Sequence, residues 1–339
     1  MAEPVRMRVV RTIRETADAC SFVLVPVAGG ITYRPGQFLT VRVPSERTGS
    51  VARSYSLSSS PVRDEPLTIT VKRTRDGYAS NWLCDNVTEG HVLECLPAGG
   101  VFAPRSLDED LLLVAAGSGI TPVMSILKSC LWGGSARITL IYANRDERSV
   151  IYAEELRSLQ TSHPGRLAVL HWLASVQGTP TAPALRAMAA PYSPREAYVC
   201  GPGPFMALVA EALGESGVPA ERIHVEKFVS LTADPFAPAV EADEDGHPAG
   251  TVHVTLDGRT HELTWPRSRP LLDVLLDAGL QVPYSCREGA CSACACVVTN
   301  GEVKMRRNDV LEPEDIDDGI VLGCQAMPIS DHVQVSYDE

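Results

Sequence analysis

The chain has 339 residues, of which 45% are apolar, 21% are charged and only 6% are aromatic. This length suggests two or three domains, and the composition is that of a folded protein and excludes a disordered one. The formal net charge of −12 argues against non-specific binding to nucleic acid or to an anionic membrane.

The amino terminus lacks an apolar core followed by a cleavage site, which a secretory signal requires. The longest uncharged run, 111–127, is divided by Gly117, Gly119 and Pro122, so it predicts a strand, a turn and a helix and no membrane span. We therefore expect a cytoplasmic protein without a membrane span, and we expect it to be a monomer.

Residues 1–107 predict a mainly β domain. Short runs of alternating apolar residues are separated by Gly, Pro and Ser clusters, which is typical of a small barrel or sandwich. The predicted strands are 21–25, 37–43, 54–57 and 67–73. One short helix is expected near Ser80.

Residues 108–232 predict an α/β domain. The apolar run 111–116 indicates a strand buried on both faces, and further strands are expected at 138–143, 167–172 and 196–200. Helices are expected at 122–131, with Thr121 as its cap and Pro122 in its first position, and at 154–159. Alternating strands and helices predict a parallel sheet with helices on both faces.

Residues 233–249 predict an acidic linker, because they contain five Asp or Glu and no Lys or Arg. Residues 250–339 predict a third domain. Asp257-Gly258 lies between two strand patterns, 251–256 and 261–265, and indicates a hairpin. A helix is expected over 271–278, ended by Gly279. This last domain carries 15 acidic against 7 basic residues.

Ten cysteines are present, and half of them lie between positions 286 and 339. Cys286, Cys291, Cys294 and Cys324 have the spacing C-x4-C-x2-C…C of plant-type 2Fe-2S clusters. Small residues between them let backbone N–H groups approach the sulfur atoms. A zinc site is the alternative, but zinc sites usually pair two short Cys turns and here only one cysteine returns. Cys296 does not fit the ligand spacing, and we interpret it as a buried strand residue.

Two other motifs suggest nucleotide binding. Gly117-Ser-Gly-Ile-Thr-Pro122 lies between a strand and a helix, where backbone N–H groups can bind a phosphate. A tight turn without a ligand is the alternative, because Pro122 replaces the third glycine of the common dinucleotide pattern. Arg53-Ser-Tyr-Ser56 offers a ring and a cation for a flavin, although ordinary barrel residues fit that pattern equally well.

Taken in order, four motifs resemble those of the ferredoxin–NADP reductase superfamily: Arg53-Ser-Tyr-Ser56, Gly117-Ser-Gly-Ile-Thr-Pro122, Cys200-Gly-Pro-Gly-Pro-Phe-Met206 and Glu226-Lys-Phe228. With the cysteine module added, the chain is similar to three-domain oxygenase reductases. Runs such as Pro44-Ser-Glu-Arg-Thr-Gly-Ser and Gly77-Tyr-Ala-Ser-Asn-Trp resemble the reductase components of 3-ketosteroid 9α-hydroxylases. The resemblance implies a β-barrel FAD domain, an α/β parallel-sheet NAD(P) domain and a β-grasp ferredoxin domain of the α+β class.

The resemblance also implies roles for particular residues. Ser56, Cys200 and Glu226 would be catalytic, with Ser56 near flavin N5 and Cys200 near the hydride-giving carbon. The residues implied to bind FAD or the nicotinamide cofactor are Arg53, Ser54, Tyr55, Ser56, Val71, Lys72, Gly77, Ser80, Asn81, Gly119, Thr121, Cys200, Gly201 and Phe228. Phe228 and Glu226 would close one face of the flavin, and the four cysteines would hold the iron.

The implied activity is electron transfer from NADH, through FAD and the 2Fe-2S cluster, to a Rieske-type oxygenase acting on a steroid. NADPH stays open as a donor, because Arg145 follows the second strand of the α/β domain. Two alternatives also stay open. One is a reductase for a di-iron hydroxylase or a phenylacetyl-CoA epoxidase. The other is a carrier ferredoxin joined to a vestigial reductase domain.

Overall fold

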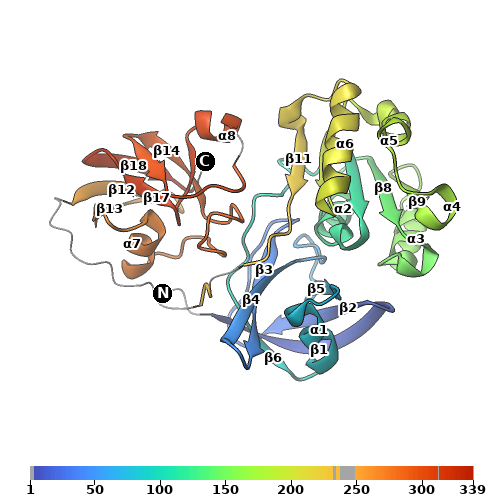
Figure 1. Ribbon diagram of the computed structural model, residues 1–339, viewed down its shortest axis with the longest axis horizontal. Coiled ribbons are helices and arrows are strands. Elements are labelled where there is room, and N and C mark those ends of the chain that lie inside the picture. Colours follow the sequence, from blue (N-terminus) through green and yellow to red (C-terminus); the bar gives the residue numbers. More distant parts are fainter. Residues whose placement is uncertain (1–3, 232–233, 237–248, 312, 339) are drawn as a thin grey trace.

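The computed structural model describes residues 4–231, 234–236, 249–311 and 313–338. Three units follow one another along the chain, a blue-to-teal barrel, a green-to-yellow α/β layer and an orange-to-red C-terminal unit (Figure 1). None of the helices in these described ranges has both the length and the hydropathy that crossing a membrane requires.

The first unit is a six-stranded antiparallel sheet with the order β4-β3-β6-β1-β2-β5. A bridge between Leu57 and Ile69 joins its two ends and closes the barrel. The strands are β1 (Val5–Thr16), β2 (Ala19–Pro26), β3 (Phe38–Ser45), β4 (Gly49–Ser56), β5 (Leu67–Lys72) and β6 (Val92–Cys95). Helix α1 (Tyr78–Asn86) begins two residues before the predicted position at Ser80.

The second unit is a parallel sheet with the order β11-β10-β7-β8-β9. Its strands are β7 (Leu111–Ala116), β8 (Ile138–Asn144), β9 (Leu167–Leu173), β10 (Glu196–Cys200) and β11 (Ile223–Glu226). Its helices are α2 (Ile120–Gly133), α3 (Ala153–Ser162), α4 (Ala174–Gln177), α5 (Ala182–Ala189) and α6 (Gly203–Glu215). Alternate residues of β7 pack into two separate cores, one against α2 and α3 and the other against α5 and α6. The predicted α/β class is therefore confirmed.

The predicted start of the helix after β7 was wrong. A 3-10 turn, Gly117–Gly119, follows the strand, and α2 begins at Ile120. Thr121 is inside the first turn of the helix, where its hydroxyl donates to the carbonyl of Ser118 at 3.0 Å and does not cap the helix. Pro122 is the third helical residue. The 3-10 turn moves the helix start toward the strand because Gly117 adopts a φ of +53°, which allows the chain to turn at once.

The C-terminal unit has a mixed sheet with the order β13-β12-β18-β14-β16, packed against α7 (Leu271–Asp277). Its strands are β12 (Gly250–Leu256), β13 (Arg259–Trp265), β14 (Ala295–Asn300), β15 (Val303–Met305), β16 (Ile320–Leu322), β17 (Ala326–Pro328) and β18 (His332–Ser336), and α8 spans Pro313–Asp317. The predicted hairpin is confirmed, because Asp257 and Gly258 both have positive φ, as a tight two-residue turn requires.

The C-terminal unit docks on the barrel through its cysteine loop. Cys286 and Ala290 pack against Ala52 of β4 and Leu231, and the hydroxyls of Ser285 and Thr40 are hydrogen-bonded. Most of the predicted linker, 233–249, lies outside the described residues. In its described part, the carboxylate of Asp234 accepts a hydrogen bond from Ser50 on β4 at 2.8 Å.

Candidate functional site

The strand order of the parallel sheet reverses between β7 and β10, and a cavity lies where these strands end. In open α/β sheets, ligands bind in the crevice at such a reversal. The cavity has a volume of about 780 Å³ and includes Gly117, Ser118 and Gly201. Of the predicted site residues, it brings together Lys72 from the barrel, Gly201 and Phe228.

One wall of this cavity was not predicted from the sequence. It consists of Gly203, Met206, Ala207 and Ala210 on α6. These positions follow the i, i+3, i+4, i+7 pattern and therefore share one helix face. This spacing in the sequence could have indicated the cavity face of α6. Most residues of α6 are apolar, however, so no single face is evident from the sequence.

The chain approaches itself very closely at Gly119, in the turn before α2. A Cβ atom built at Gly119 would lie 2.1 Å from the carbonyl oxygen of Cys200 and 2.7 Å from the nitrogen of Gly201. Only glycine fits there, so the turn after β7 and the end of β10 form one compact edge. The first backbone N–H groups of α2 lie beside this edge. An anionic ligand can bind at such a helix amino terminus.

Cys200 and Glu226 lie side by side, because they are register partners on the parallel strands β10 and β11. The Cys200 side chain is fully buried and packs toward the α2 core, so it does not line the cavity. Burial raises the pKa of the Glu226 carboxyl to about 8. Phe228 is half exposed and stands at the cavity rim.

The Arg53-Ser-Tyr-Ser56 motif forms the end of β4, beside the docked cysteine loop. The Arg53 guanidinium donates through Nη1 to the carbonyl of Leu231 at 3.0 Å. The Ser54 hydroxyl is hydrogen-bonded to Thr40. Tyr55 packs against the barrel core, where burial raises its pKa, and Ser56 is buried. The motif therefore lies between the barrel and the cysteine loop.

The predicted residues on α1 organise the start of that helix. The Ser80 hydroxyl accepts a hydrogen bond from the Thr74 amide at 3.0 Å, and the Asn81 amide donates to the Gly77 carbonyl at 2.7 Å. Gly77 caps the helix without a side-chain hydrogen bond. The first N–H groups of α1 are thus left to an external acceptor such as a phosphate. Val71, on the neighbouring β5, is fully buried.

The four predicted cluster cysteines come together at the loop between α7 and β14 and at the turn after β16. Cys286, Cys294 and Cys324 are at most 5% exposed, and Cys291 is partly exposed. Arg287, Gly289 and Ser292 have positive φ and fold the loop tightly. Cys296 is buried on β14, as predicted.

Backbone N–H groups point at the sulfur atoms of this loop. Glu288 and Ala290 each donate to the Sγ of Cys286 at 3.3 Å, and Cys324 donates to the Sγ of Cys294 at 3.4 Å. Hydrogen bonds from Cys291 and Cys324, together with these N–H groups, lower the pKa of Cys286 well below that of an ordinary thiol. Four cysteines gathered in this way, with N–H donors pointing at the sulfur atoms of Cys286 and Cys294, fit an iron–sulfur cluster.

One side chain near the cluster loop was also missed. The amide of Gln325 donates to the Sγ of Cys324 at 3.5 Å and to the carbonyl of Arg287 at 3.0 Å. Gln325 directly follows the predicted ligand Cys324 in the sequence, and this position could have indicated its role. Such outer hydrogen bonds tune an iron–sulfur centre.

The fold and these sites define a multidomain oxidoreductase with flavin, nicotinamide and iron–sulfur domains. Three family models match the chain, "Oxidoreductase FAD-binding domain" at residues 5–102, "Oxidoreductase NAD-binding domain" at 113–211 and "2Fe-2S iron-sulfur cluster binding domain" at 254–328. FAD, a nicotinamide cofactor and a 2Fe-2S cluster are therefore the cofactors of its domains.

The chain is 57% identical over 331 residues to the ferredoxin reductase component of 3-ketosteroid-9-alpha-monooxygenase from Rhodococcus rhodochrous, covering 96% of this chain and 94% of that protein. It is 30% identical to a component of the 1,2-phenylacetyl-CoA epoxidase of Escherichia coli, covering 98% and 97%. Phthalate dioxygenase reductase has the same fold, with 25% identity, a TM-score of 0.60 and 98% of each chain covered. The chain belongs to the family of the 3-ketosteroid-9-alpha-monooxygenase ferredoxin reductase components.

Proposed function

We propose that this protein takes electrons from NADH and delivers them singly to the oxygenase component of a 3-ketosteroid 9α-monooxygenase. The observation that carries the proposal is the docking of the cysteine loop against β4. Ala52 packs with Cys286 and Ala290 and directly precedes the Arg53-Ser-Tyr-Ser56 motif. The proposed flavin and cluster sites are thus neighbours, as electron transfer between them requires.

The flavin and the cluster, when bound, convert the two electrons of a hydride into successive single electrons. The chain supplies binding and orientation. Gly119, Thr121, Gly201 and the cavity wall on α6 receive the nicotinamide nucleotide, with Cys200 behind the edge that they form. Lys72 extends into the same cavity from the barrel. The protein therefore brings the hydride donor to the barrel by holding the two domains against each other.

The flavin is held by the barrel and by α1. Arg53 and the open amino terminus of α1, with Gly77, Ser80 and Asn81, bind its phosphates. Ser54, Tyr55 and Ser56 would contact the rest of the cofactor, and Val71 would support them from the barrel core. Glu226 and Phe228 cover the ring from the nicotinamide domain. These roles rest on the placement of the residues around β4, β5 and α1.

Cys286, Cys291, Cys294 and Cys324 ligate the 2Fe-2S cluster. Three of these thiols are buried, and the sulfur atoms of Cys286 and Cys294 accept hydrogen bonds from backbone N–H groups. Such donors stabilise the added negative charge of a reduced centre. The cluster is the exit point for electrons toward the partner protein.

We further propose that the partner is of the Rieske type, that the reductase is a monomer, and that it works in the cytoplasm. Domain boundaries at 107/108, 232/233 and 249/250 are part of the same proposal. None of the ten cysteines, all of which lie in the described residues, forms a disulfide, which fits a reducing compartment. NADH is the preferred donor: Arg145 is paired with Asp18 of the barrel at 3.3 Å, and this carboxylate disfavours an extra phosphate.

The test is reconstitution. Purified protein is mixed with NADH, a 3-ketosteroid and the oxygenase component of a 3-ketosteroid 9α-monooxygenase, and the 9α-hydroxylated product is assayed. The oxygenase component of a phenylacetyl-CoA epoxidase with its own substrate is the matched control, and cytochrome c reduction confirms that the reductase is active. We expect product with the steroid oxygenase only. Reduced cytochrome c without steroid product would assign the reductase to another partner.

A further inference from the structure

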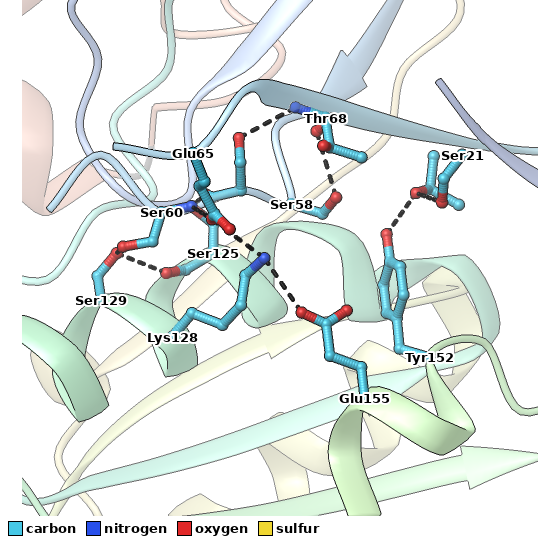
Figure 2. A network of polar contacts seen from close by, with 12 residues as sticks. Ser21, Ser58, Ser60, Glu65, Thr68, Ser125, Lys128, Ser129, Tyr152 and Glu155 are labelled. Carbon is cyan, nitrogen blue, oxygen red and sulfur yellow. Dashed lines mark hydrogen bonds and ion pairs between the residues drawn. The ribbon is translucent and has the colours of Figure 1, made fainter. Parts of the chain in front are cut away.

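A buried polar seam joins the nicotinamide domain to the flavin barrel. It consists of Ser125, Lys128 and Ser129 on α2, and Ser59, Ser60 and Glu65 on the segment between β4 and β5 (Figure 2). Lys128 and Ser129 follow Ser125 by three and four positions, so the three α2 residues lie on one side of the helix. The Ser125 hydroxyl donates to the Ser59 carbonyl at 2.6 Å, and the hydroxyls of Ser60 and Ser129 are 2.7 Å apart.

Lys128 is the charged centre of this seam. Its side chain is only 6% exposed, and its Nζ lies 3.2 Å from a carboxylate oxygen of Glu65 and 3.3 Å from one of Glu155 on α3. Glu65 also accepts a hydrogen bond from the Ser60 amide. Figure 2 shows the ammonium group between the two carboxylates. One carboxylate belongs to the barrel and the other to the nicotinamide domain, so removing the cation leaves two negative charges facing each other across the domain boundary.

Both sides of the seam continue directly into the proposed site. Ser59 and Ser60 follow the Arg53-Ser-Tyr-Ser56 motif within four residues. On the other side, Thr121 precedes Lys128 by seven helical residues, a rise of about 10 Å. A second contact reinforces the seam, since the Tyr152 hydroxyl donates to Thr70, two residues before Lys72 on β5.

The Lys128 ammonium is buried, whereas the Glu65 and Glu155 side chains are 28% and 42% exposed. Such a pair adds little net stability, because desolvation of the cation offsets most of the attraction, but it can specify one arrangement of two surfaces. The nucleotide cavity is formed by the nicotinamide domain except for Lys72. Binding of NADH therefore depends mainly on one domain, whereas alignment of the hydride with the flavin depends on how two domains are set against each other. A residue at the boundary between the two domains therefore affects the alignment of the hydride with the flavin more than it affects the affinity for NADH.

We propose that Lys128 is a positioning residue that sets the orientation of the nicotinamide domain on the flavin barrel for hydride transfer. This inference rests on the proposed function, because it assumes that NADH reduces a flavin bound to the barrel. Lys128 acts through Glu65 and Glu155 and through the serines on either side of it. It does not touch the reacting atoms.

The test is anaerobic stopped-flow reduction of the holoenzyme flavin by NADH. For Lys128→Met we expect the limiting rate to fall about tenfold or more, because misplacements of about 1 Å cost up to a hundredfold. The NADH concentration that gives half the limiting rate should stay within about twofold of wild type, since binding is unaffected. Lys128→Arg keeps the cation and should restore most of the rate.

Arg157→Met is the matched control. Arg157 pairs with Glu154 on α3 at 2.7 Å, but both side chains are exposed and the pair lies within one helix. This variant should reduce its flavin at the wild-type rate. If Lys128→Met does not fold or does not retain FAD, Ser125→Ala tests the same seam without a change of charge. A smaller fall in the limiting rate, again with unchanged half-saturation, is expected for it.

An unchanged limiting rate in Lys128→Met, or in Ser125→Ala where that variant replaces it, would overturn the inference. So would a weakening of NADH binding that accounts for the whole loss, because the seam would then support the cavity and not the alignment. A wild-type holoenzyme whose flavin NADH does not reduce would instead refute the proposed function. The two failures are therefore distinguishable in one experiment.

Discussion

Gly119→Ala tests the compact edge between α2 and β10. The new Cβ would lie 2.1 Å from the carbonyl oxygen of Cys200 and 2.4 Å from its carbonyl carbon, whereas ordinary contacts begin near 3.4 Å. Both contacts are with backbone, so α2 or β10 must move by about 1 Å. A misplacement of this size can slow a reaction by about a hundredfold, and overpacking costs about 1–3 kcal/mol of stability.

The assay is anaerobic flavin reduction by NADH, with thermal unfolding measured in parallel. Gly214→Ala is the matched control, because its Cβ would have no neighbour within 4 Å and its φ is not positive. Alanine there should stabilise α6 by about 0.4–1 kcal/mol and leave the rate unchanged. A wild-type rate in Gly119→Ala, with FAD and the fold retained, would refute the argument that this close approach places the nucleotide.

Cys291→Ser should abolish electron delivery to the oxygenase while NADH still reduces the flavin; loss of flavin reduction itself would contradict the assigned roles. Glu226→Gln should change the pH dependence of unfolding. Burial raises the pKa of Glu226 to about 8 from 4.5, so the folded state holds this proton more tightly and its contribution to stability falls between those pH values. In denaturant titrations, the free energy of unfolding of the variant should increase relative to that of wild type as the pH rises toward 8. A difference that does not change with pH would contradict this. Gln325→Leu removes a donor from the Sγ of Cys324, so redox titration should give a lower cluster potential, and an unchanged potential would assign Gln325 a purely structural role.

The sequence predicted well those elements whose conformation is determined by residues close together in the chain. The cysteine spacing implied a shared loop, and the four thiols do come together. Asp257-Gly258 forms the expected hairpin because both residues tolerate positive φ. The apolar run at 111–116 favours a strand buried on both faces, and β7 is completely buried.

Other elements depend on partners that are distant in the chain. β1 is the longest of the described strands, but it was not predicted because half of its residues are exposed and four of them are arginines. The α6 helix was missed because Gly-Pro at its start indicates a turn. Lys128 is almost fully buried, although lysine usually lies at the surface, because two carboxylates from separate elements surround it. Cys200 was placed correctly at a strand end, but the direction of its side chain depends on packing against α2.

Electrons from NADH are expected to reach the cluster through the flavin within one chain. The most direct measurement is an anaerobic titration of the purified holoenzyme with NADH, followed by visible absorption for the flavin and by electron paramagnetic resonance for the cluster. We predict that both centres become reduced, and that Cys291→Ser loses the cluster signal while its flavin is still bleached. A cluster that stays oxidised beside a fully reduced flavin would contradict the account.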